Sequence, residues 1–160
     1  MRTRIVLSVA VAALGIVALA QARNDMLMLP LDDVLKLKKT KEIIGSDIRL
    51  YFADQTPERA VGQYLGDLIV QGKGDQWTRK GNQSSQREDI PTCKDALRDA
   101  LTKMIEQARK RGAAAVIKIV SYYKYMEKSS ATEYECHAGE SRAVVELKGV
   151  AVRLDEAPAK

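Results

Sequence analysis

The sequence contains two cysteines and one histidine, and these are its most reactive side chains. Thiolates and imidazoles act as nucleophiles and as metal ligands. Cys136 and His137 are adjacent, however, and adjacent side chains of a strand point to opposite faces. We therefore expect neither a Cys–His catalytic pair nor a Cys–His chelate, and we assign no catalytic residue and no metal ligand. Two roles for Cys93 and Cys136 remain open: a disulfide bond, which we favour, or a metal-binding or thiol-reactive site that uses both.

The sequence lacks the common motifs for nucleotide binding and for serine hydrolysis. The segment Gly72-Lys73-Gly74-Asp75 is rich in glycine, but it does not end in Gly-Lys-Ser/Thr and is therefore no Walker A loop. No Gly-x-Ser-x-Gly segment is present. Glu133 and Glu135 share a face of an expected strand, where we expect solvation rather than catalysis. We predict that the protein is not an enzyme and needs no cofactor, and a carboxylate-based hydrolase stays an alternative.

Aromatic side chains make up only 5% of the sequence, so the few near polar segments are the candidate ligand contacts. Trp77 is the only tryptophan and lies in the polar stretch 74–91, which we expect to be a long loop. We favour a Trp77 that caps the edge of the core over one that contacts a ligand. Trp77, Tyr122, Tyr123 and His137 together form the candidate binding surface.

The first 22 residues are typical of a secretory signal peptide. Arg2 and Arg4 precede an uncharged apolar run over 5–20, and Ala20-Gln21-Ala22 supplies the small residues that signal peptidase requires. An uncleaved membrane anchor is the alternative, although this run is shorter than the roughly 20 residues that span a bilayer. We expect cleavage after Ala22, a periplasmic location and no stable membrane anchor in the mature chain. An oxidising periplasm also favours the disulfide.

The charge of the chain gives little support for nucleic-acid binding. The sequence has 26 Lys and Arg against 21 Asp and Glu, a net charge of +5. Cleavage of the signal peptide removes Arg2 and Arg4, and the remaining small excess is weak evidence for contact with a polyanion. We expect no nucleic-acid partner.

The elements that must position these residues begin with one long helix. Apolar residues recur with a period of 3.6 at Ala96, Leu97, Ala100, Leu101, Met104, Ile105 and Ala108. Thr92 and Asp95 have the spacing of a capping box, and Gly112 follows a basic last turn. We predict a helix from Thr92 to Arg111, with Cys93 in its first turn.

Strands are indicated on both sides of this helix by apolar runs or by alternation. The expected strands cover Ile48–Phe52, Val61–Lys73, Ala113–Tyr125, Thr132–Ala138 and Arg142–Leu154. Glycines within Val61–Lys73 indicate a bulged or strongly curved strand. In Thr132–Ala138, alternation predicts that Cys136 is buried, while Glu133, Glu135 and His137 face water.

These elements predict an α+β fold. One main helix packs on a curved, mostly antiparallel sheet of about five strands, preceded by a short N-terminal helix over Leu31–Ile44. We divide the chain into a signal peptide (1–22), an N-terminal extension with the short helix (23–45), a single α+β domain (46–154) and a tail (155–160).

Two segments, Ser121-Tyr122-Tyr123-Lys124 and Glu135-Cys136-His137-Ala138-Gly139, carry a resemblance to a known family. The chain resembles small exported proteobacterial proteins that carry the label "excinuclease ATPase subunit". More remotely, its order of helix, strand, hairpin and strand is similar to the YbjQ-like fold, which includes proteins labelled as heavy-metal-binding and the RcsF outer-membrane stress sensor. RcsF-type domains contain disulfides and act by protein contact. The resemblance implies a non-enzymatic periplasmic binding or envelope-sensing module whose partner is another envelope protein or a cell-wall component.

Overall fold

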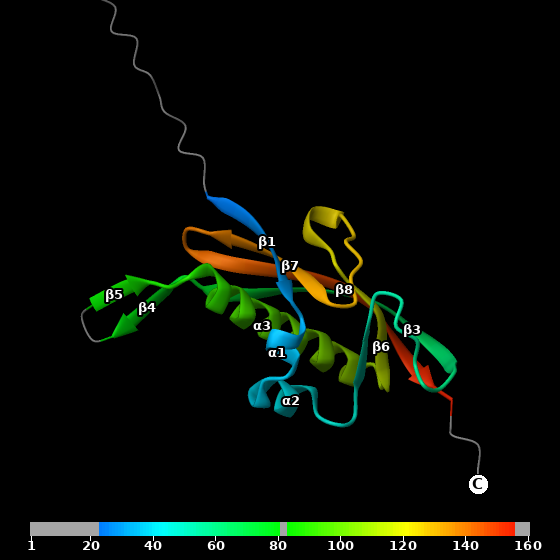
Figure 1. Cartoon of the computed structure of the whole chain (residues 1–160). Coiled ribbons are helices and arrows are strands. Elements are labelled where there is room, and N and C mark those ends of the chain that lie inside the picture. Colours follow the sequence, from blue (N-terminus) through cyan, green and yellow to red (C-terminus); the bar gives the residue numbers. More distant parts are fainter. Residues whose placement is uncertain (1–22, 81–82, 156–160) are drawn as a thin grey trace, which may run out of the picture.

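The computed structural model describes residues 23–80 and 83–155. The expected signal peptide and all but the first residue of the expected tail lie outside the described residues. A long helix packs on a curved, mostly antiparallel sheet, as Figure 1 shows, so the predicted α+β class is confirmed.

The main helix, α3, spans Asp89–Lys110. The predicted apolar stripe is buried, and Gly112, with a φ of +67°, follows the C-terminus of the helix as expected. The predicted start at Thr92 is wrong, since the helix begins three residues earlier. Pro91 does not prevent this, because residues in the first helical turn need no N–H partner within the helix. Thr92 is not a cap: its hydroxyl donates to the Glu88 carbonyl oxygen over 2.8 Å.

The sheet is organised around β8, which covers Arg142–Leu154 as predicted. The long strand β3 (Val61–Asp75) pairs antiparallel along one edge of β8, with register shifts that confirm the expected bulges. The other edge of β8 is shared by β7 (Glu133–Gly139) and β6 (Ala115–Ser121). β2 (Arg49–Phe52) extends the sheet beyond β6 in parallel orientation.

A sixth strand, β1 (Asn24–Pro30), extends the sheet beyond β7 and was not expected from the sequence. It pairs antiparallel with β7 along its whole length. The segment Met26-Leu27-Met28-Leu29 shows no alternation of apolar and polar residues, so only its partner strand reveals it. Segment 23–45 therefore contributes a strand to the same sheet that the rest of the domain builds.

Two glycines of β3 allow α3 to lie directly on the sheet. A Cβ atom at Gly72 would overlap the backbone of Ala96 and Ala100, and one at Gly74 would overlap the backbone of Thr92. Both positions alternate into the buried face of β3. The absence of side chains there brings backbone against backbone and fixes where the helix sits.

Two further predictions about local structure are wrong. The expected helix over Leu31–Ile44 is divided into α1 (Asp32–Leu35) and α2 (Lys38–Ile44), because Leu37 has an extended backbone between them. The expected loop over 74–91 contains a hairpin of β4 (Trp77–Lys80) and β5 (Gln83–Gln86), which extends from one end of the sheet in Figure 1. Its strands are polar, so no hydrophobic alternation marks them.

The expected strand Ala113–Tyr125 ends at Ser121, and a 3-10 turn, η1, covers Tyr123–Tyr125. Lys124 and Tyr125 have left-handed backbones, with φ of 50° and 66°. Few non-glycine residues adopt this conformation, and two in succession turn the chain sharply. The turn directs the chain after β6 back over β7. Among the described residues, no helix is long and apolar enough to cross a membrane.

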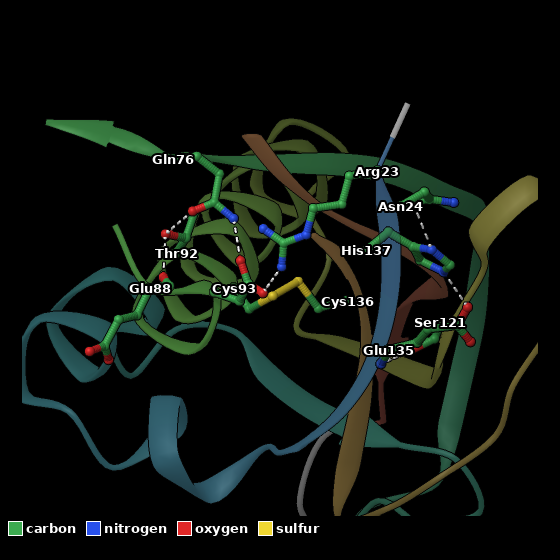
Figure 2. The surroundings of a disulfide bond; sticks show 11 residues. Arg23, Asn24, Gln76, Glu88, Thr92, Cys93, Ser121, Glu135, Cys136 and His137 are labelled. Carbon is green, nitrogen blue, oxygen red and sulfur yellow. Dashed lines mark hydrogen bonds and ion pairs between the residues drawn. A yellow bond between two sulfur atoms is a disulfide. The ribbon is translucent and has the colours of Figure 1, made fainter. Parts of the chain in front are cut away.

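The expected disulfide joins Cys93 of α3 to Cys136 of β7, with 5.9 Å between their Cα atoms (Figure 2). Both residues are completely buried. Because α3 begins at Asp89, Cys93 lies in the second helical turn rather than in the first.

Candidate functional site

The face of β7 opposite the disulfide carries Glu135 and His137, and this face is not solvated as the alternation predicts. Each of the two residues is only 8% exposed. The cause is tertiary, since β1 pairs along one edge of β7 and the segment after β6 folds over its surface. The prediction that these residues face water is therefore wrong.

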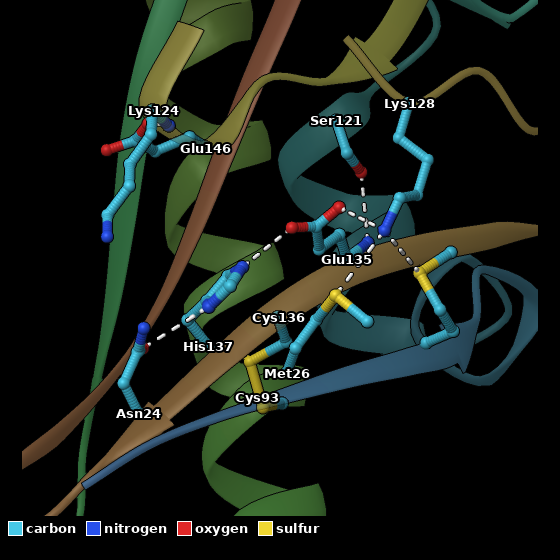
Figure 3. Close-up of polar contacts among 11 residues, drawn as sticks. Asn24, Met26, Cys93, Ser121, Lys124, Lys128, Glu135, Cys136, His137 and Glu146 are labelled. Atoms are coloured by element: carbon cyan, nitrogen blue, oxygen red, sulfur yellow. Dashed lines mark hydrogen bonds and ion pairs between the residues drawn. A yellow bond between two sulfur atoms is a disulfide. The ribbon is translucent and has the colours of Figure 1, made fainter. Parts of the chain in front are cut away.

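His137 is held by a stacked ring and by two polar partners. The Tyr123 ring lies over the imidazole, with 3.4 Å between ring centroids and 14° between planes. Imidazole Nε2 lies 2.6 Å from Glu135 Oε1, and Nδ1 lies 3.2 Å from the side-chain oxygen of Asn24 (Figure 3). Both ring nitrogens are therefore engaged, and the ring has one fixed orientation.

Glu135 connects this histidine to Lys128. The Lys128 ammonium lies 2.8 Å from Glu135 Oε2, and the backbone N–H of Glu135 donates to the Ser121 hydroxyl over 2.9 Å. Burial alone raises the pKa of Glu135, but the hydrogen bonds from Lys128 and His137 outweigh it and lower that pKa below its ordinary value. The carboxylate is thus a charged, fully bonded group within the fold.

A hollow of about 450 Å³ opens beside the imidazole, and we name it the aromatic hollow. Three residues of the candidate binding surface line it: Trp77, Tyr123 and His137. Trp77 belongs to the hairpin and is 49% exposed, so the expectation that it caps the core edge is wrong. Tyr122 lies elsewhere. Its ring is in edge-to-face contact with Tyr125, and the Lys148 ammonium lies 5.2 Å from the centroid of the Tyr122 ring.

Charged residues also line the aromatic hollow. Arg23 forms ion pairs with Asp25 and Asp89. Arg142 is exposed, and among the described residues it has no ion-pair partner. Glu140 lies on the same rim. A cation without an internal partner beside aromatic rings is suited to an anionic ligand that carries a flat or apolar part.

The structure joins the two cysteines in the disulfide. The chain has only two, and both are in the disulfide, so neither offers a thiolate. The metal-binding or thiol-reactive alternative based on Cys93 and Cys136 would need this bond to be reduced. Sequence reasoning missed Asn24, Lys128 and Arg142: Asn24 comes from a distant segment, and no motif marks Lys128 or Arg142.

No protein-family model matches the sequence, and the comparison with curated proteins found no match either.

Proposed function

We propose that the protein is a non-enzymatic binding module of the bacterial envelope, and that the aromatic hollow is its ligand site. The ligand is an anionic segment of a cell-wall component or of another envelope protein. One observation carries the proposal: Trp77, Tyr123 and His137 come from three separate elements and line one hollow. Arg142 supplies the positive charge on its rim.

Binding fits the polar network better than catalysis does. A general base must reach a substrate proton with an available nitrogen or oxygen. Here Asn24 and Glu135 engage both nitrogens of His137, while Lys128 and His137 engage the two oxygens of Glu135. The network therefore works as a rigid floor for the hollow, and the aromatic faces and Arg142 contact the ligand.

An oxidising compartment fits the buried disulfide, since such bonds persist in the periplasm and are rare in the cytosol. The signal-like segment 1–22 favours the same compartment. The resemblance to exported proteobacterial proteins and to RcsF-type domains agrees with a module that acts by contact.

The test uses Trp77, which is the only tryptophan and therefore an intrinsic reporter of the hollow. Soluble peptidoglycan fragments, whose stem peptides carry carboxylates, are titrated while tryptophan fluorescence is recorded. We expect a saturable change in emission. Arg142→Gln should weaken binding about tenfold, which is the loss expected for one hydrogen bond to a charged group. Tyr64→Ala, at an exposed tyrosine of β3 outside the hollow, should leave binding unchanged.

An envelope-protein partner is tested by cross-linking from a photoreactive residue at position 77 in intact cells. A protein captured there, and lost with Arg142→Gln but retained with Tyr64→Ala, supports the same site with a protein ligand. The proposal would be contradicted if the fragments caused no saturable change in fluorescence and no cross-link depended on Arg142.

A further inference from the structure

The pairing of β1 with β7 places two thioethers beside an imidazole and a carboxylate. Met26 lies directly opposite His137, and Met28 lies opposite Glu135. Side chains two residues apart in a strand share a face, and opposite side chains lie close together. All four side chains therefore occupy one face of this two-strand ribbon, the face opposite the disulfide.

A cation already lies among these side chains. The Lys128 ammonium is 3.4 Å from Met26 Sδ, 3.9 Å from Met28 Sδ and 2.8 Å from Glu135 Oε2. The ammonium is a strongly hydrated charge, and a thioether is only a weak hydrogen-bond acceptor. Two soft donors thus border a cation position that the lysine uses poorly.

We propose that this position is a binding site for a soft monovalent metal ion of the Cu(I) and Ag(I) class. Met26 Sδ, Met28 Sδ and Glu135 Oε2 are its ligands, the three atoms that surround the ammonium. Thioethers select Cu(I), and the Glu135 carboxylate supplies the negative charge that a cation needs. A site for Zn²⁺ would need thiolates, imidazoles or carboxylates in greater number. Over 23–80 and 83–155, no three His, Cys, Asp and Glu residues are grouped to hold one.

Charge explains why the ion is monovalent. The incoming ion and the Lys128 ammonium each carry one positive charge, so the exchange leaves the balance beside buried Glu135 unchanged. Lys128 is partly exposed, and its side chain can swing into solvent when the ion enters. Met26 is 54% exposed, which gives the ion a path to the site.

The imidazole stays outside the site and holds the carboxylate that borders it. Lys128 and His137 bind the two oxygens of the same carboxylate, so imidazole Nε2 faces the ammonium across Glu135. When the metal ion replaces the ammonium, this nitrogen keeps its contact with Glu135 Oε1, and Glu135 Oε2 turns from the ammonium to the ion. This inference does not rest on the ligand of the aromatic hollow.

The experiment is a calorimetric titration of the purified chain, with its disulfide intact, using Ag⁺. Silver needs no reductant, so the disulfide is preserved. We expect one saturable site. Met26→Leu and Met28→Leu keep the shape of the side chain and remove the sulfur, and each should weaken binding at least about tenfold, the lower end of the cost of losing a supporting group at a metal site. Met126→Leu, at a methionine that is 74% exposed in the turn after β6, is the matched control and should change nothing.

Lys128→Gln gives the sharpest result, because it removes the competing ammonium and should tighten Ag⁺ binding. A merely structural role of Lys128 would instead leave binding unchanged or weaken it. Three results would each overturn the site. The unaltered chain could show no saturable binding of Ag⁺, both Met→Leu variants could bind Ag⁺ as tightly as the unaltered chain, or Lys128→Gln could bind it more weakly. Melting curves of the variants confirm that they are folded before titration.

Discussion

Cys136 bonds to Cys93 of α3 on one face of β7, while its sequence neighbours Glu135 and His137 form the polar network on the other face. The disulfide therefore anchors β7, the strand that carries the candidate site, to α3. Stability of the core and geometry of the site are coupled through the backbone of β7.

Removal of the disulfide should lower the melting temperature markedly. The bond joins residues 43 positions apart, and the chain-entropy model gives about 4 kcal/mol for a loop of this length. Cys93→Ala and Cys136→Ala should each lower the midpoint, and the double variant should add little, because all three lack the same bond. Thermal unfolding followed by circular dichroism measures this. A midpoint that a thiol reductant leaves unchanged would contradict the prediction.

Leu101→Ala should reduce the free energy of unfolding by about 2–5 kcal/mol, because Leu101 of α3 is completely buried and the loss of its side chain leaves a cavity. Glu106→Ala, on the exposed side of the same helix, should change it by no more than about 0.5 kcal/mol. Urea titration of the two variants gives both values. Similar losses would show that the two faces of α3 are wrongly assigned.

Gly72→Ala should destabilise the fold by about 1–3 kcal/mol or more, because the added methyl group overlaps the backbone of α3. Gly62→Ala makes the same change in the same strand, where the methyl group overlaps only the movable side chain of Asp155 and lies at an ordinary contact distance, 3.6 Å, from its backbone nitrogen. The difference between the two variants in urea titration isolates the close approach of helix and strand. Equal effects would mean that α3 does not depend on this contact.

Acid should weaken the ion pair between Asp47 and Arg109. Hydrogen bonds from Arg109 lower the pKa of Asp47 from 3.8 to about 2. The pKa of Asp47 is lower in the folded state than in the unfolded state. The contribution of the ion pair to folding stability is therefore complete above about pH 4 and is lost as the pH falls through about 2. Asp47→Asn should therefore lower the melting temperature at neutral pH and flatten its fall across this window. Asp67→Asn, at an exposed aspartate without an ion pair among the described residues, should keep the wild-type pH profile.

Export should leave a mature chain that begins at Arg23 or Gln21, since Ala20-Gln21-Ala22 and Ala18-Leu19-Ala20 both supply small residues for the peptidase. β1 begins at Asn24, so cleavage at either point preserves the strand and its pairing with β7. Mass spectrometry of the protein from a periplasmic fraction measures the terminus. Intact Met1 on most molecules would contradict the signal-peptide interpretation.

The sequence by itself determined the elements whose signals are local. The 3.6-residue period predicts the buried stripe of α3, and the apolar run Arg142–Leu154 matches β8 from end to end. Compartment and cysteine count predict the bond between Cys93 and Cys136. These predictions succeed because side-chain periodicity and cysteine chemistry depend on few neighbours.

Only the tertiary structure decided the candidate site. Alternation places His137 on a solvated face, yet β1 and the turn at Tyr123 bury it, and both come from distant parts of the chain. Met26 becomes a neighbour of His137 solely through the register of β1 on β7. Strand pairing is chosen by long-range packing, and a strand's own residues do not specify which partner will cover its outer face.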